Sequence, residues 1–131
     1  MQKTKLVNLQ HFTEDNGYLT VVQEKSGVIP FPMVRIFNVC ANKDDKRGEH
    51  AHKKCSQLLF CPYGKIEVNC FTSDKKESFL LDKPSVGLII YPMVWAEQYY
   101  LKNNTILTVI CDQKFDENDY IRNYQKYLSL I

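Results

Sequence analysis

Short apolar segments separated by turn residues follow one another along the chain from about Leu19 to Cys111. Each segment has the length of a strand, and each ends at polar, Pro or Gly residues that are typical of turns. No helical pattern lies between them, so the sequence predicts an all-β fold, an antiparallel sandwich or barrel, and not a parallel α/β sheet. The predicted strands are VRIFNVC, CSQLLFC, KIEVNCFT, ESFLL, VGLIIY, VWAEQYYL and TILTVIC.

The tail of the chain has a different pattern. From Asp116 onward, DENDYIRNYQKYLSLI places aromatic and aliphatic residues at helical spacing behind an acidic start, which suits a helix N-terminus. The sequence therefore predicts one C-terminal helix, and packing against the sheet explains its tyrosines most simply. The apolar positions of this predicted helix are Tyr120, Ile121, Tyr124, Tyr127, Leu128 and Ile131.

A strand near the start of the chain, from about Lys5 to Leu9, has no obvious hairpin partner in the sequence. An unpaired strand edge favours pairing with a second copy of the same protein. We therefore expect a homodimer in which the N-terminal strands are exchanged.

Length and composition are those of one ordinary domain, and residues 1–131 are expected to form a single unit. The net charge of +2 arises from 17 basic and 15 acidic side chains that are mixed along the chain, so nucleic acid is not an expected partner. No apolar segment reaches the roughly 20 residues that span a bilayer, and no signal-peptide core follows the polar start MQKTK. We expect no membrane partner and a cytoplasmic protein.

The cysteines are odd in number and have no CxxC spacing. Most of them lie within apolar strand segments, so reduced thiols in the core explain them better than a zinc site or a disulfide framework. They are Cys40, Cys55, Cys61, Cys70 and Cys111.

Two of the three histidines, His50 and His52, lie two residues apart, so on a strand their side chains leave the same face. Together with Gln57 and Gly64 they form the pattern H-x-H-x4-Q-x6-G, which resembles the first motif of the cupin barrels. The second cupin motif supplies a further histidine, but here Ala96 follows Trp95. Because a carboxamide is a weak ligand for transition metals and alanine is none, we expect no bound metal.

The histidine pair is better suited to moving protons. Imidazole titrates near neutral pH, so one ring can accept a proton while the other orients or protonates the substrate. The spacing alone also fits a surface pair or a satisfied polar network. Arg47, just before the pair, has the planar fork that suits a diphosphate, although a loop salt bridge explains it equally well.

Other polar and aromatic side chains are candidate substrate contacts. Arg35 and Gln57 lie on predicted strands, where inward-facing polar groups need partners and a ligand is one such partner. Trp95 and Tyr99 lie on one face of a strand and are candidates for the wall of a sugar or thymine pocket. Core packing is the simpler explanation for Trp95.

Three segments, RGEHAHKK, VGLIIYPMVW and FDENDYIRNYQKY, resemble the sugar 3,4-ketoisomerases, a cupin family that acts on dTDP-4-keto-6-deoxyglucose. The similarity extends from about Val34 to Tyr127. It implies a jelly-roll β-barrel that dimerises with strand exchange, uses no metal or other cofactor, and catalyses with His50 and His52. The implied product is a dTDP-3-keto-6-deoxyhexose, a precursor of the 3-amino-3,6-dideoxy sugars of surface glycans. Ala96 departs from the many relatives with histidine there, so no role of that residue is carried over.

The residues fit this chemistry independently of the resemblance. A ketone at C4 acidifies the proton on C3, so one base can form an enediol, and a proton returned to C4 leaves the ketone at C3. We favour His52 as the main proton carrier and His50 as the polarising or relaying partner, although sequence leaves this order open. The galacto or gluco configuration of the product depends on the face that is reprotonated, and the loop TEDNGYL, with a turn at Asn16 and Gly17, is a candidate for that control.

Three other functions fit parts of the pattern. A metal-dependent cupin is disfavoured by Gln57 and Ala96. A sugar-nucleotide 3,5-epimerase would use a histidine base in a similar barrel, and a non-catalytic cupin would bind a sugar nucleotide without turning it over. Identification of the product separates all three from a ketoisomerase.

Overall fold

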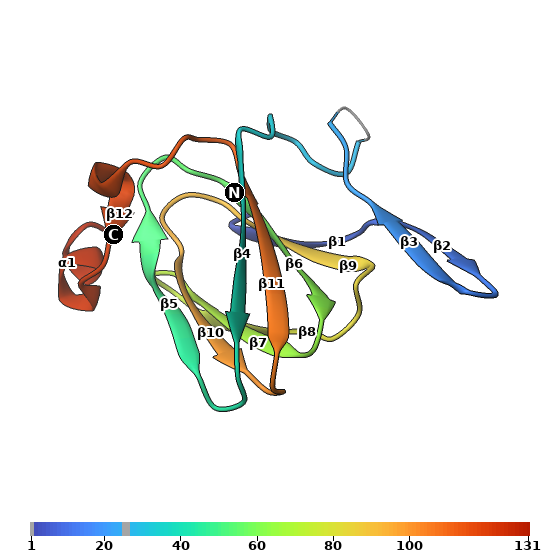
Figure 1. Cartoon of the computed structure of the whole chain (residues 1–131). Coiled ribbons are helices and arrows are strands. Elements are labelled where there is room, and N and C mark those ends of the chain that lie inside the picture. The colour runs from blue at the N-terminus through green and yellow to red at the C-terminus, as the bar shows by residue number, and fades with distance from the viewer. Residues whose placement is uncertain (1, 25–26) are drawn as a thin grey trace.

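Two five-stranded antiparallel sheets face each other in the computed structural model, which describes residues 2–24 and 27–131 (Figure 1). In order across the first sheet, the strands are β1 (Thr4–Asn8), β9 (Val86–Ile90), β6 (Gln57–Tyr63), β11 (Thr105–Cys111) and β4 (Arg35–Ala41). The order across the second sheet is β12 (Tyr120–Ile121), β5 (Lys46–His52), β10 (Trp95–Tyr100), β7 (Ile66–Phe71) and β8 (Lys76–Leu81). The predicted all-β class is confirmed, and every predicted strand segment lies on a strand.

The main core lies between the two sheets because alternate side chains of each strand point inward. Leu107, Val109 and Cys111 of β11 are almost completely buried there, together with Val68 of β7. The inward side chains of β4 are only partly buried, and β4 lies at the edge of its sheet. The interior of the barrel is therefore less fully covered beside β4 than beside β11.

A second apolar cluster covers the outer face of the first sheet. The segment that follows β3 crosses this face, and its Ile29 packs on Leu58, Ile89 and Ile110. Beside this segment lies a groove that we call the outer groove, and Ile36 at its edge is 64% exposed. The outer groove is lined by Thr20, Val22, Met33, Val34, Arg35, Ile36, Phe60 and Ile110.

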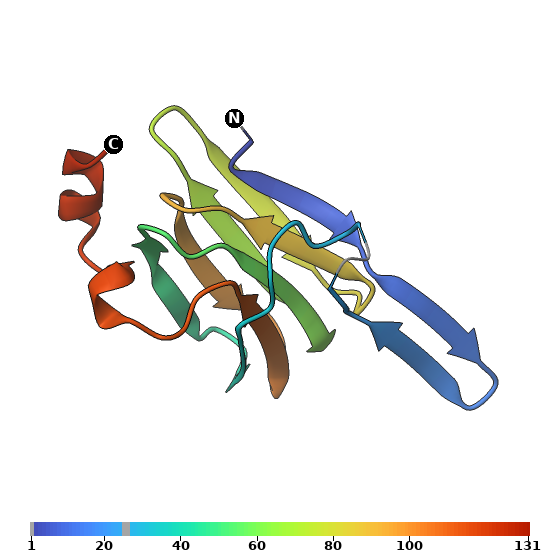
Figure 2. The same cartoon turned by 90° about the horizontal axis from the view of Figure 1, so that it is seen from above.

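The N-terminal strand has a partner within the chain, which corrects the expectation drawn from the sequence. β1 pairs with β9 in antiparallel register, from Thr4 opposite Ile90 to Asn8 opposite Val86. The sequence pattern shows only neighbouring hairpin partners, so this distant pairing could not be foreseen. The next two strands, β2 (Gln10–Glu14) and β3 (Gly17–Val21), pair with each other and with no other strand of the described residues, and this hairpin projects from the barrel (Figures 1 and 2).

The C-terminal segment is helical over a shorter range than predicted. Glu117–Asp119 form one 3-10 turn, η1, then Tyr120–Ile121 form β12, and only Tyr124–Ser129 form the helix α1. The helix begins late because the backbone at positions 120 and 121 pairs with β5 and because the side chain of Asn123 caps the first turn at Lys126. The helix packs on the second sheet as expected, since Tyr127 is fully buried and its hydroxyl donates to backbone carbonyls of that layer.

All five cysteines are free, and four of them are buried, as expected for reduced core thiols. Cys40 is the exception, because it lies on the outward face of β4 and is exposed.

None of the helices within residues 2–24 and 27–131 has the length and apolar character needed to cross a membrane.

Candidate active site

A β-bulge in β5 decides which of its side chains face the barrel interior. Ala96 of β10 lies opposite His50, and Gln98 lies opposite Arg47, so Glu49 is an extra residue in β5. Gly48 and Glu49 have positive φ values of 84° and 56°, as a bulge of this kind requires. Because the extra residue shifts the alternation, Arg47 lies on the same face as His50 even though three positions separate them.

The histidine rings lie close together and are held in defined tautomers. Their centroids are 4.9 Å apart and their planes are perpendicular. Nδ1 of His50 lies 3.0 Å from the carbonyl oxygen of Gly48, and Nδ1 of His52 lies 2.9 Å from Oδ2 of Asp119. Because both partners accept hydrogen bonds, each neutral ring carries its proton on Nδ1 and has a lone pair on Nε2. Nε2 of His52 is buried and has no hydrogen-bond partner among residues 2–24 and 27–131.

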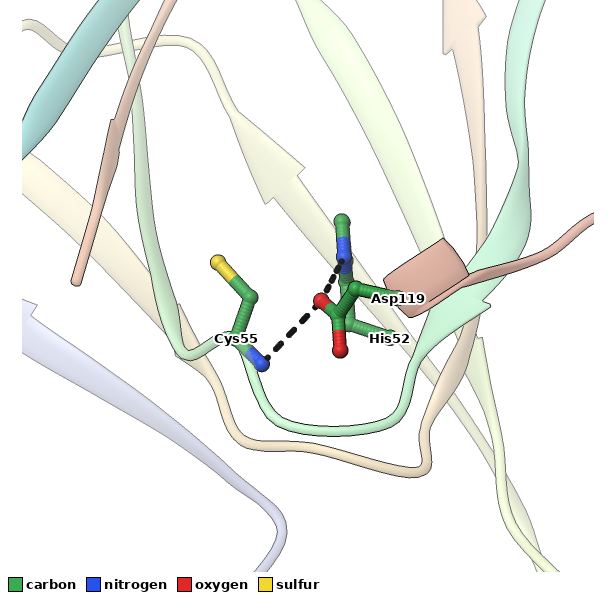
Figure 3. A group of neighbouring side chains, drawn as sticks. All are labelled: His52, Cys55 and Asp119. Carbon is green, nitrogen blue, oxygen red and sulfur yellow. Dashed lines mark hydrogen bonds and ion pairs between the residues drawn. The ribbon is translucent and has the colours of Figure 1, made fainter. Parts of the chain in front are cut away.

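Asp119 is held in place by the loop that follows β5. Its Oδ1 accepts the backbone N–H of Lys54 at 2.7 Å, and its Oδ2 accepts that of Cys55 at 3.3 Å (Figure 3). The backbone carbonyl of Asp119 accepts the N–H of Lys53 at 2.9 Å. The carboxylate is thus oriented by main-chain donors, and in turn it orients the ring of His52.

Burial keeps both histidines neutral. It lowers the pKa of His50 from 6.5 to about 4, and the carbonyl of Gly48 opposes this only in part. Burial also lowers the pKa of His52, opposed by the carboxylate of Asp119. At neutral pH both rings therefore have a free lone pair with which to accept a proton.

Tyr120 packs against both histidines. Its ring centroid lies 4.3 Å from that of His52 and 5.0 Å from that of His50. Nη2 of Arg35 donates to the Tyr120 hydroxyl at 3.5 Å, and the guanidinium carbon of Arg122 lies 4.2 Å from the ring centroid. No sequence pattern separates Tyr120 from the packing residues of the tail, because its position depends on the pairing of β12 with β5, which places it opposite His52.

Arg35 and Gln57 face inward as expected and meet at one sulfur atom. Nη2 of Arg35 donates to Sγ of Cys111 at 3.4 Å, and Nε2 of Gln57 donates to the same atom at 3.5 Å. These contacts, together with a hydrogen bond from the Cys55 thiol, lower the pKa of Cys111. Nε of Arg35 is buried and has no hydrogen-bond partner in the described part of the chain, so this guanidinium retains a donor for a ligand.

A small cavity inside the barrel joins the histidine pair to the residues around it. It is lined by His50, His52, Cys55, Gln57, Leu59, Ile90, Tyr91, Val94, Ala96 and Gln98. The cavity contains two proton acceptors, two side-chain amides and an otherwise apolar wall. These groups can exchange hydrogen bonds with sugar hydroxyls, but the cavity of about 10 Å³ holds no more than a water molecule, so a sugar ring would lie against it and not inside it.

Trp95 and Tyr99 share one face of β10, as predicted, but it is the face away from the histidines. Nε1 of Trp95 and the hydroxyl of Tyr99 both donate to Glu97, and the Trp95 ring packs on Tyr124 and on Tyr127. The prediction that these two aromatic residues wall the substrate pocket is therefore wrong. Both faces of β10 carry large side chains, so alternation alone did not indicate which face points inward.

The side chains at the cupin ligand positions do not fit a metal ion. Gln57 uses its amide nitrogen on Cys111, and Ala96 provides no donor atom. His50 and His52 alone are too few ligands for a stable transition-metal site. The chemistry of this site is therefore argued from the protein side chains.

Comparison with known proteins identifies the family. Residues 2–131 match the family described as "FdtA: WxcM-like, C-terminal". The chain belongs to this family. It is 32% identical to the TDP-4-oxo-6-deoxy-alpha-D-glucose-3,4-oxoisomerase of Aneurinibacillus thermoaerophilus, over 98% of this chain and 95% of that protein.

Solved structures of FdtA-type relatives agree with this assignment. The sugar 3,4-ketoisomerase QdtA of Thermoanaerobacterium thermosaccharolyticum, solved with TDP, is 34% identical and superimposes with a TM-score of 0.92, covering 98% of this chain and 93% of that one. A histidine-to-asparagine variant of QdtA, solved with TDP-4-keto-6-deoxyglucose, is 33% identical with a TM-score of 0.93, covering 99% of this chain and 94% of that one. The expected membership of the sugar 3,4-ketoisomerase family is confirmed, and these relatives favour an isomerase over a 3,5-epimerase.

Proposed function

We propose that this protein converts TDP-linked 4-keto-6-deoxyglucose to its 3-keto isomer, and that His50 and His52 transfer the protons. The observation that carries the proposal is a pair of neutral imidazoles whose Nε2 lone pairs are free beside one cavity. The FdtA-type relatives named above act on this class of substrate or bind it. In the pathway, this step would supply a 3-keto sugar for amination to 3-amino-3,6-dideoxy sugars of surface glycans.

His52 is the better placed base. When its Nε2 takes the proton from C3 of the sugar, the ring becomes an imidazolium, and the carboxylate of Asp119 stabilises that charge through Nδ1–H. The electrons left on C3 form the enediol, and the oxygen at C4 becomes a hydroxyl. Return of a proton to C4 and loss of the proton from the oxygen on C3 leave the ketone at C3.

His50 is suited to the proton transfers between the two sugar oxygens. Its ring lies perpendicular to that of His52, and its Nδ1–H is bound only to the backbone carbonyl of Gly48. A backbone carbonyl stabilises an imidazolium less than a carboxylate does, so His50 releases a proton more readily than His52. This property suits a relay that must return to its neutral form within each turnover.

Arg35, Arg47 and Gln57 are proposed as substrate contacts. The free Nε donor of Arg35 lies beside Tyr120, where it can stabilise negative charge on an enediolate oxygen. Gln57 lines the cavity with the histidines. Arg47 is exposed on the same face of β5, three positions from His50, and is suited to the diphosphate of the nucleotide.

Catalysis by side chains alone requires neither metal nor redox cofactor. We expect the purified protein to keep its full rate after exhaustive treatment with a chelator. Stoichiometric metal in the active protein, with loss of rate on its removal and recovery on its return, would contradict the proton-transfer mechanism.

A homodimer remains part of the proposal, with the β2–β3 hairpin in place of the single strand as the exchanged element. The hairpin pairs with no other strand of the described part of the chain, and its Phe12, Tyr18 and Leu19 are each more than half exposed. An exposed strand edge with apolar side chains is a site for pairing with another copy.

A cytoplasmic location is proposed as well, since sugar nucleotides of this kind are made from cytoplasmic precursors.

The deciding experiment is incubation of the protein with TDP-4-keto-6-deoxyglucose, followed by NMR of the product. Migration of the carbonyl from C4 to C3 is expected, and trapping with a 3-aminotransferase would secure the unstable product. Inversion at C3 or C5 with the ketone still at C4 would show an epimerase instead. Binding without any turnover would show a non-catalytic cupin.

A further inference from the structure

A group of metal-ligand side chains lies beside the histidine pair, at the loop between β5 and β6. A ring nitrogen of His52, Sγ of Cys55 and a carboxylate oxygen of Asp119 all lie within 4.8 Å of one another. Figure 3 shows these three side chains gathered from the end of β5, the loop that follows it, and η1. His52 is 6% exposed and Cys55 is 2% exposed. Imidazole, thiolate and carboxylate are the three ligand types that proteins use for Zn²⁺.

This set is distinct from the cupin ligand positions and shares only His52 with them. Unlike those positions, it includes a sulfur atom, that of Cys55, whose thiol donates to the backbone carbonyl of Ser56 at 3.4 Å. Thiolate ligands favour borderline and soft cations, whereas Mg²⁺ and Ca²⁺ require oxygen ligands. The chemistry of the group therefore points to Zn²⁺ or a similar thiophilic ion.

The group is largely organised before any ion arrives. Backbone N–H donors of Lys54 and Cys55 hold the carboxylate of Asp119, and that carboxylate holds the ring of His52. In a tetrahedral zinc site, bonds of about 2.0 to 2.3 Å place ligand atoms roughly 3.3 to 3.8 Å apart. The three ligand atoms lie within 4.8 Å of one another, so binding requires them to close by up to about 1 to 1.5 Å.

We propose that His52, Cys55 and Asp119 form a binding site for a thiophilic divalent cation such as Zn²⁺, and that its occupancy inhibits the enzyme. When the ion binds Nδ1 of His52, the ring proton moves from Nδ1 to Nε2, and the thiol proton of Cys55 passes to solvent. No group is oxidised or reduced, and a water molecule completes four ligands. Inhibition rests on the proposed function, because His52 with its proton on Nε2 has no lone pair with which to take the proton from C3, whereas binding itself does not depend on that function.

Titration of the metal-free protein with Co²⁺ tests the site without any turnover. We expect one ion per chain, with a thiolate-to-cobalt charge-transfer band and the d–d absorption of four-coordinate cobalt. Cys55→Ser should weaken binding by ~100-fold or more and remove the thiolate band. Cys40→Ser is the matched control, since it also removes one thiol but from the exposed face of β4, and it should bind as the native protein does.

Zn²⁺ inhibition provides the second measurement. The rate of each protein with Zn²⁺ is compared with its own rate without metal. Zn²⁺ should lower the rate of the native enzyme and of Cys40→Ser, and it should leave the rate of Cys55→Ser nearly unchanged. If Cys55→Ser fails to fold, Cys55→Ala replaces it, and a zinc-dependent rise in the melting temperature of the native protein tests binding directly.

Three results would overturn the site: no thiolate band in the native protein, the same band and affinity in Cys55→Ser, or equal inhibition of Cys55→Ser and native protein. The last result would mean that the cation acts at the histidine pair alone. The expected cobalt spectra in a protein without isomerase activity would support the site and contradict the proposed function.

Discussion

At the scale of single residues, the two histidines differ in what holds their Nδ1 protons. His52 donates to the carboxylate of Asp119, whereas His50 donates to a backbone carbonyl. A carboxylate stabilises an imidazolium more strongly, so in the proposed reaction His52 would be the stronger base and His50 the more readily reversible relay. Neighbouring residues of one type are thus given separate roles by partners that come from other parts of the chain.

Replacing each histidine by asparagine tests these roles. We expect His52→Asn to lower kcat by ~10²- to 10⁴-fold, which is the usual contribution of general acid–base catalysis, and His50→Asn to lower it less. The double variant should be scarcely slower than His52→Asn, because two residues on one proton path act as a unit. His11→Asn, which removes the exposed third histidine, is the control. A double variant with the native rate would mean that the pair is structural.

The pH dependence of rate and stability follows from the lowered pKa values. His50 must be neutral to act, and its pKa in the folded protein is about 4. As the pH is lowered through 6.5, kcat/KM should therefore stay constant, and it should fall only as the pH approaches 4. In the unfolded chain His50 binds a proton with a pKa of 6.5, whereas in the folded chain it stays neutral until the pH approaches 4. Its contribution to the free energy of unfolding is therefore fully present above pH 6.5 and is lost as the pH falls from 6.5 toward 4. Urea unfolding across this range should show a weaker pH dependence in His50→Asn, and equal dependence in both proteins would contradict the pKa assignment.

At the scale of elements, the bulge in β5 sets the composition of the site. If all the residues of β5, Glu49 included, alternated regularly, Arg47 would lie on the face opposite to His50. Gly48 permits the bulge, because its φ of 84° is unfavourable for other residues and an added Cβ would lie 3.1 Å from the carbonyl oxygen of Ala96. A single glycine thus adds a cationic side chain to the inward face of β5.

Gly48→Val tests this feature, because a β-branched side chain disfavours the positive φ that the bulge uses at this position. If the strand then pairs residue for residue with β10, Glu49 takes a regular place and Arg47 turns to the outer face, while His50 and His52 remain inside. If Arg47 binds the diphosphate, KM should rise by ~10-fold or more with a smaller change in kcat, as expected for loss of a charged hydrogen bond worth about 1.5 to 3 kcal/mol. Arg47→Ala in the native backbone should give a similar KM. An unchanged KM in both proteins would remove Arg47 from the substrate site.

The same element shows where sequence reasoning succeeds and where it ends. The period of two predicted the strands and correctly placed His50 and His52 together, because both lie beyond the bulge on one regular stretch. It could not predict the inward turn of Arg47, which depends on a local departure from that period. It also could not find Asp119, which is 67 residues from His52 and reaches it through the pairing of β12 with β5.

At the scale of the whole molecule, the β2–β3 hairpin and the outer groove carry one group of exposed apolar side chains, and the C-terminal segment carries another. Figures 1 and 2 show the β2–β3 hairpin projecting on the side opposite to α1. Phe12, Tyr18 and Leu19 of the hairpin and Ile36 at the outer groove are each between 52% and 64% exposed. Burial of these side chains against a second copy would provide the apolar contact that a stable dimer needs.

Sedimentation tests this arrangement. We expect the native protein to be a dimer at micromolar concentration and Ile36→Glu to be a monomer, because a charge buried in an apolar interface is costly. Leu80→Glu is the matched control, since Leu80 is 48% exposed on β8 of the other sheet, and it should remain a dimer. A native monomer, or equal dissociation of both variants, would contradict the proposed interface.

The contact between His52 and Asp119 also fixes when this enzyme becomes active during its synthesis. The ribosome delivers all the strands of both sheets except β12 before it adds η1, so a nascent chain ending near Cys111 has the sequence for most of the barrel but nothing to orient its base. Proteolytic loss of the segment after position 115 would have the same effect on a finished molecule. If the barrel folds without this segment, we expect the fragment to be folded but to have little isomerase activity.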